Sequence, residues 1–329
     1  MKTYFDVEDP NISAEIVEWT HNTSTGHELI SIAITAPRFL LAQLNTYGSA
    51  AKNAASSRAI PTAKILARVM TPVLPPVVLA NKAGMQGEVE VEQDLKQSFY
   101  DDIRILAKHA AEFARVYDKK VHKQHVNRFL EPFITVKQLM TMELNDWGNL
   151  LAQRRHQDAQ PEFQILASEI LRAMKANKNR CRPLTMLDKD WIFREGKDLN
   201  TVVVNNMTDH QSWMHLPFIT AAENKSLNDA VEVVTLSVAR CARVSYWNDD
   251  SSMHLDLADA QRMVREKLLH SDSDSPRHMS PFEHVAIPIK QRGHGKFRGY
   301  VQLRKYIVDE RAKFPFAEHG ISYLKRDEA

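Results

Sequence analysis

The stretch HELISIAITAPRFLLAQLN (residues 27–45) decides the fold class, because two kinds of secondary structure meet within it. Its first ten residues alternate in character and are rich in β-branched side chains, which predicts a strand. Pro37 follows where a helix can begin, and RFLLAQLN has its apolar residues at helical spacing. A strand that runs directly into a helix favours a fold of mixed α and β structure.

Helices dominate the middle of the chain. From residue 91 to about residue 120, apolar side chains recur every three or four positions, which predicts a long amphipathic helix. Helices are also expected over 145–156 and 161–176, the second with Pro161 in its first turn. We therefore expect one α+β domain over residues 1–329, with a mixed or antiparallel sheet and a layer of long helices over about 91–178.

Further segments have patterns that predict their local structure. Strands are expected at 133–142, within TVVVNN (201–206), and after a turn at 278–290. Helices are expected at 226–246 with Ser226 as the cap, at 255–270, and over VQLRKYIVDERAKF (301–314). A polar loop is expected at 271–276, and an extended segment at 71–80.

The composition is that of an ordinary globular protein. The chain has 329 residues, of which 43% are hydrophobic, and a formal net charge of +2, so no strong overall charge demands a nucleic acid or a membrane as partner. The apolar stretch 71–80 is short and holds three prolines, and the N-terminus lacks an apolar segment of signal-peptide length. The two cysteines, Cys181 and Cys241, lie far apart, which suggests neither a disulfide nor a thiolate metal site and fits the cytoplasm.

NTYGSAAKNAASSRAIP (45–61) combines small residues with hydrogen-bond donors. Ser56 and Arg58 stand two residues apart in it, so one hydroxyl and one guanidinium can meet the same anion. The alternative is an ordinary solvated polar turn. The local pattern alone favours that alternative.

NDWGNLLAQRRH (145–156) places Asn149 and Arg154 on one predicted helix, with Trp147 and Leu150 as packing anchors. An arginine held in this way can stabilise negative charge on a ring that becomes electron-rich in a transition state. The alternative is a surface arginine beside Arg155.

Two segments near the C-terminus also carry reactive side chains. HMSPFEHVA (278–286) holds two histidines and a glutamate, but the spacing is not that of a zinc motif, so no metal is expected. RGHGKFRG (292–299) is basic and rich in glycine, so it is either a phosphate-binding loop or a basic surface turn. The residues alone therefore indicate an α+β protein with several possible anion sites.

Taken together, four segments resemble the flavin-dependent thymidylate synthases (ThyX). They are NAASSRAIP (53–61), NLLAQRRHQDAQPEF (149–163), ARCARVSY (239–246) and HMSPFEH (278–284). In the ordinary family the last two segments come first, so the chain is similar to the permuted, phage-type branch. The implied location is cytoplasmic, in the host if a phage encodes the chain.

The resemblance implies a dUMP substrate, bound FAD, methylenetetrahydrofolate as carbon donor, and a homotetramer with active sites between subunits. It implies that Arg154 polarises the uracil ring. It places four residues on dUMP, with Arg128 as the phosphate-binding arginine lent to a neighbouring subunit: Gln43, Ser56, Arg58 and Arg128. It places five residues on the flavin or folate side: Asn53, Asn149, Ser245, His278 and Ser280.

The chain departs from the family where the family reads Arg-His-Arg, since it has Thr46, Tyr47 and Gly48 there. The default expectation is conversion of dUMP to dTMP with reduced FAD. A second hypothesis is hydroxymethylation of dUMP, in which water replaces the flavin hydride. A third is an inactive paralogue that only binds nucleotide. Direct binding of nucleic acid is the least favoured, because no platform of aromatic and basic residues is evident.

Overall fold

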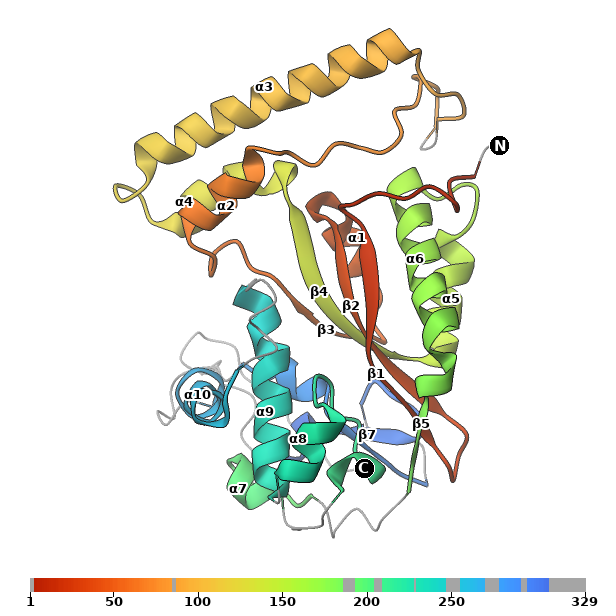
Figure 1. Ribbon diagram of the computed structural model, residues 1–329, viewed down its shortest axis with the longest axis vertical. Helices are drawn as coiled ribbons and strands as arrows, with labels where there is room; N and C mark the ends of the chain where they lie inside the picture. The colour runs from red at the N-terminus through yellow and green to blue at the C-terminus, as the bar shows by residue number, and fades with distance from the viewer. Residues whose placement is uncertain are drawn as a thin grey trace, which may run out of the picture.

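The computed structural model describes residues 3–84, 87–185, 193–203, 209–227, 229–246, 255–269, 278–290 and 295–307 (Figure 1). Its centre is a five-stranded sheet in the order β3-β4-β2-β1-β5. The strands are β1 (Ser13–Asn22), β2 (Glu28–Pro37), β3 (Ala51–Ala54), β4 (Thr135–Glu143) and β5 (Arg182–Leu184). All neighbours are antiparallel except β1 and β5, so the sheet is mixed and the expected α+β class is confirmed.

β2 is the central strand, and most of its side chains are buried. Helices α5 (Leu144–Arg154) and α6 (Pro161–Asn177) lie along one side of the sheet (Figure 1). Trp147 on α5 and Phe163 on α6 are fully buried there, and the Trp147 indole donates to the Ile30 carbonyl on β2. These anchors fix the direction of α5, which ends at Arg154.

A second group of elements lies below the sheet in Figure 1. It contains α7 (Leu199–Val202), α8 (Ala221–Ser226), α9 (Ala230–Arg243), α10 (Leu257–Met263), a π-helix (Val264–Leu269), a 3₁₀ turn (Ser280–Glu283), β6 (Ala286–Pro288) and β7 (Tyr300–Gln302). α9 is buried on nearly all sides, which makes it the core of this group. No helix in the described ranges is long and apolar enough to cross a bilayer.

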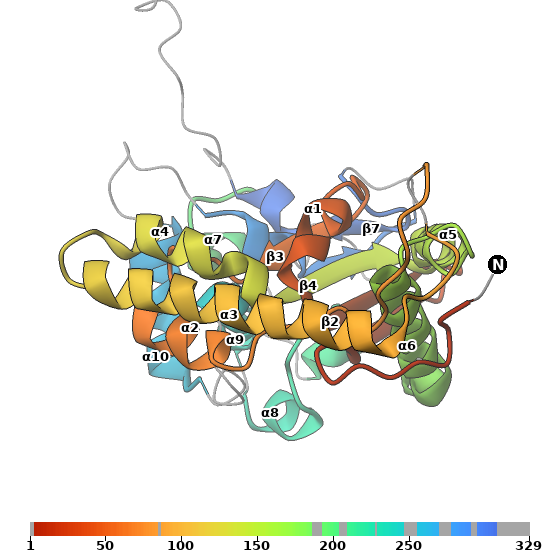
Figure 2. The same ribbon diagram turned by 90° about the horizontal axis from the view of Figure 1, so that it is seen from above.

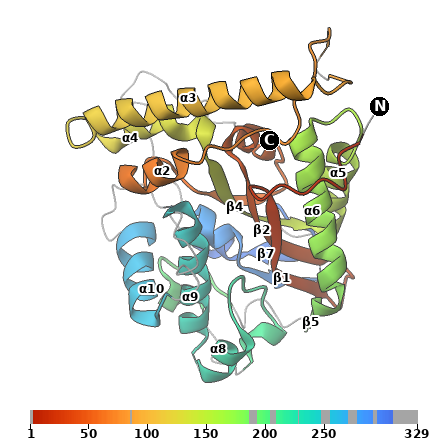
Figure 3. The same cartoon turned by 45° about the horizontal axis from the view of Figure 1, so that its top comes forward.

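A long helix crosses the other end of the molecule. This is α3 (Gln93–Tyr117), and it packs on α2 (Thr62–Val69) and on η2 (Asn127–Phe133), which follows α4 (Lys123–Val126). Figure 3 shows α3 lying over these short helices and above the upper edge of the sheet. Of the helices expected between 91 and 178, α3 is thus at one end of the sheet, whereas α5 and α6 lie along its side.

The strand at 133–142 and the helices at 145–156, 161–176 and 255–270 are confirmed, whereas three predictions were wrong. Thr201 lies in α7 instead of a strand, because Asp198 and Thr201 form a capping box that starts a helix; residues 204–206 lie outside the described ranges. Ser226 ends α8, and Asp229 caps α9 through the Val231 amide. Tyr300–Gln302 is a strand paired with β6, and only Leu303–Tyr306 is helical.

Some predictions are not covered by the described structure. The polar loop at 271–276 and residues 308–314 of the predicted last helix lie outside it. The single-domain organisation over residues 1–329 and the permuted order of the family segments stay predictions.

Candidate functional site

A cavity of about 420 Å³ opens between β3, α4, the end of α9 and the 3₁₀ turn that begins at Ser280. Six of the residues singled out in the sequence line it: Asn53, Ser56, Arg58, Ser245, His278 and Ser280. Their segments are far apart in the chain, yet the fold brings them to one place.

Asn53 holds these segments together. Its Nδ2 donates to the Cys241 carbonyl at 2.5 Å, and its Oδ1 accepts from the hydroxyls of Ser245 at 2.7 Å and Ser280 at 3.5 Å. The Ser56 amide adds a bond to the Ser245 carbonyl at 2.9 Å. Because Asn53 is buried and its amide is occupied, its role is to position the cavity wall.

The loop that carries Arg58 is fixed from behind. The Nδ2 of the buried Asn127 donates to the carbonyls of Ser57 and Ile60 at 2.8 and 3.0 Å, and the Ser57 hydroxyl donates to Glu131. The Arg58 side chain itself is exposed and makes no hydrogen bond or ion pair with any residue that the structure describes. Its guanidinium is therefore available to a ligand in the cavity.

The cavity is basic. Lys267, which lies over the Tyr246 ring at 5.7 Å, joins Arg58 in its lining. A neighbouring hollow of about 270 Å³ shares Lys267 and adds Lys64 and Arg243. No Asp or Glu is among the residues that line either hollow. Cations without a competing carboxylate suit an anionic ligand such as a phosphate.

Arg154 and Gln43 form a separate cluster. The Arg154 Nε donates to the Tyr47 hydroxyl at 2.8 Å, its Nη1 donates to the Gln43 Oε1 at 3.3 Å, and the guanidinium lies 4.6 Å from the centre of the Phe163 ring. Gln43 in turn donates to Gln160 at 2.5 Å. Neither Arg154 nor Gln43 lines the cavity that holds Arg58.

The two remaining candidates differ in position. Arg128 is exposed, and its Nε donates to the carbonyl of Gln124 at 3.2 Å; Gln124 lines the cavity, whereas Arg128 does not. Asn149 lies exposed on α5, among residues that do not line the cavity.

Two basic residues near the C-terminus, Lys296 and Arg304, are engaged within the protein. Lys296 donates to Glu283 at 2.7 Å and to the Ala50 carbonyl at 3.0 Å, and Arg304 also pairs with Glu283. Lys296 is therefore a structural residue and not a free phosphate ligand. Among the residues that the structure describes, no group of three or more His, Cys, Asp or Glu side chains is placed to hold a metal ion.

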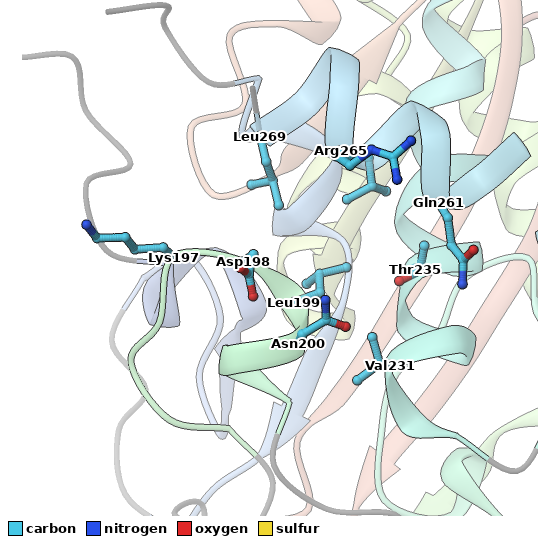
Figure 4. Close-up of a pocket in the computed structure, with 10 residues that line it drawn as sticks. Lys197, Asp198, Leu199, Asn200, Val231, Thr235, Gln261, Arg265 and Leu269 are labelled. Atoms are coloured by element: carbon cyan, nitrogen blue, oxygen red, sulfur yellow. The ribbon is translucent and has the colours of Figure 1, made fainter. Parts of the chain in front are cut away.

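A larger hollow of about 600 Å³ lies between α7, α9 and the α10–π-helix segment (Figure 4). Its lining includes Lys197, Asp198, Thr235, Gln261 and Arg265, and Lys197 points away from the others in Figure 4. None of the residues singled out in the sequence lines it. The smaller, basic cavity is the better candidate site.

A family model described as thymidylate synthase complementing protein matches residues 6–177, about half of the chain. The chain belongs to this family. The resemblance to flavin-dependent thymidylate synthases is thereby confirmed, and with it the expected class of enzyme, a thymidylate-synthase-type transferase. A comparison with curated protein sequences finds no significant match.

Two solved structures are among those similar to the chain. One is the UMP/dUMP methylase PolB from Streptomyces cacaoi bound with 5-Br UMP, at 14% identity over 51% of this chain and 90% of that one, with a TM-score of 0.42. The other is ThyX from Helicobacter pylori with FAD and dUMP, at 16% identity over 46% of this chain and 71% of that one, with a TM-score of 0.31. At these values neither structure supports the assignment of a residue.

Sequence reasoning missed part of both clusters. Lys267 and Tyr246 line the cavity, whereas Gln160 and Phe163 surround Arg154. Phe163 could have been found from the sequence, because it lies in the first turn of the predicted helix that follows Arg154 and belongs to the buried face of that helix. Lys267 had none, since exposed lysines on a helix are common.

Proposed function

We propose that the chain transfers one carbon to C5 of a pyrimidine deoxynucleotide, with dUMP as substrate and methylenetetrahydrofolate as donor. The observation that carries this proposal is the cavity in which Arg58, Ser56 and Lys267 face one space without a carboxylate. Arg58 offers a planar fork to phosphate oxygens, and Ser56 adds a hydroxyl. Arg128, which is exposed and does not line the cavity of its own chain, is a further phosphate ligand in this proposal, lent between subunits.

Arg154 has the features needed to stabilise charge on the pyrimidine. When C5 becomes nucleophilic, negative charge spreads over the ring, and a fixed guanidinium lowers the energy of that state. Phe163 and the Tyr47 hydroxyl hold Arg154 in one orientation, so little reorganisation is needed during the reaction.

The phosphate donors and the ring-binding arginine lie in different clusters of one chain. We therefore propose that a complete site combines the Arg58 cavity of one copy with the Arg154 cluster of another. This arrangement agrees with the shared active sites and the homotetramer that the family resemblance implies. The two free cysteines fit a reaction in the cytoplasm.

FAD is the cofactor that the family implies, but the residues at the family's Arg-His-Arg position do not fit its phosphate. The Thr46 hydroxyl donates to the Gln43 carbonyl at 2.6 Å, the Tyr47 hydroxyl accepts from Arg154, and Gly48 has no side chain. These three positions thus offer no cation to a flavin phosphate. This observation favours a second candidate, hydroxymethylation, in which water adds to the exocyclic methylene group on C5 in place of a hydride.

Product analysis separates the candidates. The purified chain is incubated with dUMP and methylenetetrahydrofolate, with and without FAD and a reductant, and its visible spectrum is recorded. A flavin spectrum with dTMP as product supports the methylation reaction. A colourless protein that forms 5-hydroxymethyl-dUMP supports the second candidate. Binding of dUMP without any product would contradict both and indicate an inactive nucleotide-binding paralogue.

A further inference from the structure

α3 is unusual among the described helices, because a long element is held by very small side chains. It runs over Gln93–Tyr117 and crosses nearly the full width of the molecule (Figure 2). Its buried residues are Ala107, Ala111 and Ala114. Its larger apolar side chains therefore contribute little to the core of this chain.

Five of those side chains, Leu95, Phe99, Leu106, Phe113 and Tyr117, form one exposed apolar seam on the helix. At 100° per residue they lie within about 40° of one another, beside the alanine face. Their exposed fractions are Leu95 59%, Phe99 44%, Leu106 57%, Phe113 40% and Tyr117 40%. The opposite flank carries acidic and basic residues, among them Asp101, Lys108, Glu112 and Arg115. α3 thus presents an apolar seam to the outside and a mixed-charge face beside it.

The spacing of the residues in the seam is the same from either end of the helix. Its members are separated by four, seven, seven and four residues, so Leu106 is the centre of the pattern. A spacing of seven residues is that of helices packed along each other. If a second α3 runs antiparallel about a two-fold axis at Leu106, Phe99 meets Phe113 of the partner subunit and Leu95 meets Tyr117 of the partner subunit. This is the self-complementarity that an isologous interface requires.

Polar pairing and area also favour a second copy as the occupant. Asp102 and His109 flank the seam on the same side. The antiparallel register brings Asp102 of one copy near His109 of the other copy. The seam exposes roughly 500 Å² per copy, or about 1,000 Å² for a pair, which is the lower bound for a biological interface. A lipid surface would instead require a polar face rich in Lys and Arg, whereas this one is mixed.

We propose that two copies of this chain pair through antiparallel α3 helices with Leu106 at the two-fold axis. The pair extends toward the candidate site, because Phe113 stacks with Tyr117 at 4.8 Å and meets the exposed Phe129 edge-on at 4.9 Å. Phe129 lies in η2, which directly follows α4, and Gln124 on α4 lines the cavity. The inference gives a surface to the oligomer of the proposed function, but it does not depend on any reaction.

Cysteine cross-linking tests the register directly. Phe99→Cys and Phe113→Cys variants of the full chain are prepared, mixed and oxidised, and covalent dimers are measured. The mixture is expected to form at least several-fold more dimer than either variant alone, and the wild type gives the background from Cys181 and Cys241. Dimers that form best within Phe99→Cys alone would show a parallel pair and overturn the proposal, as would no cross-link in the mixture.

The oligomer mass gives a second test that is independent of activity. Leu106→Glu places two like charges at the axis and is expected to halve the mass measured by light scattering. Ile105→Glu is the matched control, because Ile105 is also exposed and apolar but lies off the seam; it is expected to keep the wild-type mass. Circular dichroism confirms that both variants fold. A monomeric wild type, or equal masses for both variants, would contradict the α3 pair even if the enzyme is active.

Discussion

At the scale of single residues, Asn53 has the largest structural role in the candidate site. Replacing it with Ala leaves the buried Cys241 carbonyl without its donor and removes the acceptor for Ser245. Unsatisfied buried groups of this kind cost about 1–3 kcal/mol each. We expect Asn53→Ala to lower the free energy of unfolding by about 2 kcal/mol in urea titrations. Asn149→Ala, at an exposed position, is the control and should change it by less than about 0.5 kcal/mol.

In the proposed function, nucleotide binding depends on Arg58. A charge-assisted hydrogen bond contributes about 1.5–3 kcal/mol, so Arg58→Gln should weaken dUMP binding by roughly one to two decades in calorimetric titration. Arg265→Gln changes an exposed arginine that lines the other hollow and should leave the affinity unchanged. Equal dUMP affinities for wild type and Arg58→Gln would show that the cavity lined by Arg58 is not the nucleotide site.

Tyr47 connects the departure from the family motif to Arg154. Tyr47→Phe keeps the ring but removes the hydroxyl that accepts from Arg154 Nε. If Arg154 acts on the ring in the transition state, kcat should fall roughly tenfold, equivalent to about 1.4 kcal/mol, while dUMP affinity changes little. Steady-state kinetics and calorimetry measure the two quantities. A change in affinity alone would assign Tyr47 to substrate binding instead.

At the scale of elements, the caps of the helices near the C-terminus can be checked by substitution. Asp229 accepts from the Val231 amide at 2.8 Å, whereas Ser226 only donates to a carbonyl within the preceding helix. Asp229→Ala should therefore cost about 1 kcal/mol of stability, and Ser226→Ala clearly less. Chemical unfolding of both variants measures this difference. The reverse order would restore Ser226 as the cap that the sequence suggested.

Elements with a clear period could be predicted from the sequence, whereas those set by distant contacts could not. The spacing of apolar residues gave α3, α5 and α6 correctly. TVVVNN has the composition of a strand, but the capping box at Asp198 starts a helix there. β3 lies in a stretch of small residues without strand character, and its pairing with β4 creates it. Tertiary context overrides local preference in such short segments.

The candidate site shows the same division. Asn53 meets Ser245 across 192 positions and Ser280 across 227 positions, and no local pattern contains such contacts. Only the family resemblance grouped these residues before the structure did. It could not show that Arg154 and Gln43 lie in a different cluster, because that depends on how β2 and α5 are placed in space.

At the scale of the whole molecule, a buried chain of hydrogen bonds joins the sheet to the second group of elements. The Thr20 hydroxyl is hydrogen-bonded to the Nδ1 of His215 at 2.8 Å. The Nε2 of the same His215 ring is hydrogen-bonded to the Ser31 hydroxyl, also at 2.8 Å. Ser31 bonds Thr141 at 2.6 Å, and Thr141 bonds the Nδ1 of His284 at 2.8 Å. This network thus links Thr20 on β1, Ser31 on β2 and Thr141 on β4 through His215 and His284.

This buried chain makes stability depend on pH. Burial lowers the pKa of His284 from 6.5 to about 3, and burial also holds the pKa of His215 well below its ordinary value. Both rings are neutral in the folded protein but regain a pKa near 6.5 when unfolded. Their contribution is therefore complete above pH 6.5 and is lost as the pH falls from 6.5 toward 3.

We expect the free energy of unfolding to fall by about 1.4 kcal/mol per pH unit for each histidine over that range. His284→Asn keeps a hydrogen-bonding group near Thr141 but cannot titrate. The free energy of unfolding of this variant should therefore fall less steeply with pH, by the contribution of one histidine. Urea titrations from neutral pH down to about pH 5 measure both profiles. A variant profile as steep as that of the wild type would show that His284 is not the buried neutral group described here.

The most direct test of the proposed activity follows the carbon itself. Methylenetetrahydrofolate labelled in its methylene carbon is incubated with dUMP and the full chain, and the nucleotide fraction is analysed by mass spectrometry. We expect label on C5 of the pyrimidine with wild type and a large loss of label with Arg58→Gln under limiting dUMP. Wild-type protein that binds dUMP but transfers no label, with or without FAD and a reductant, would contradict the account.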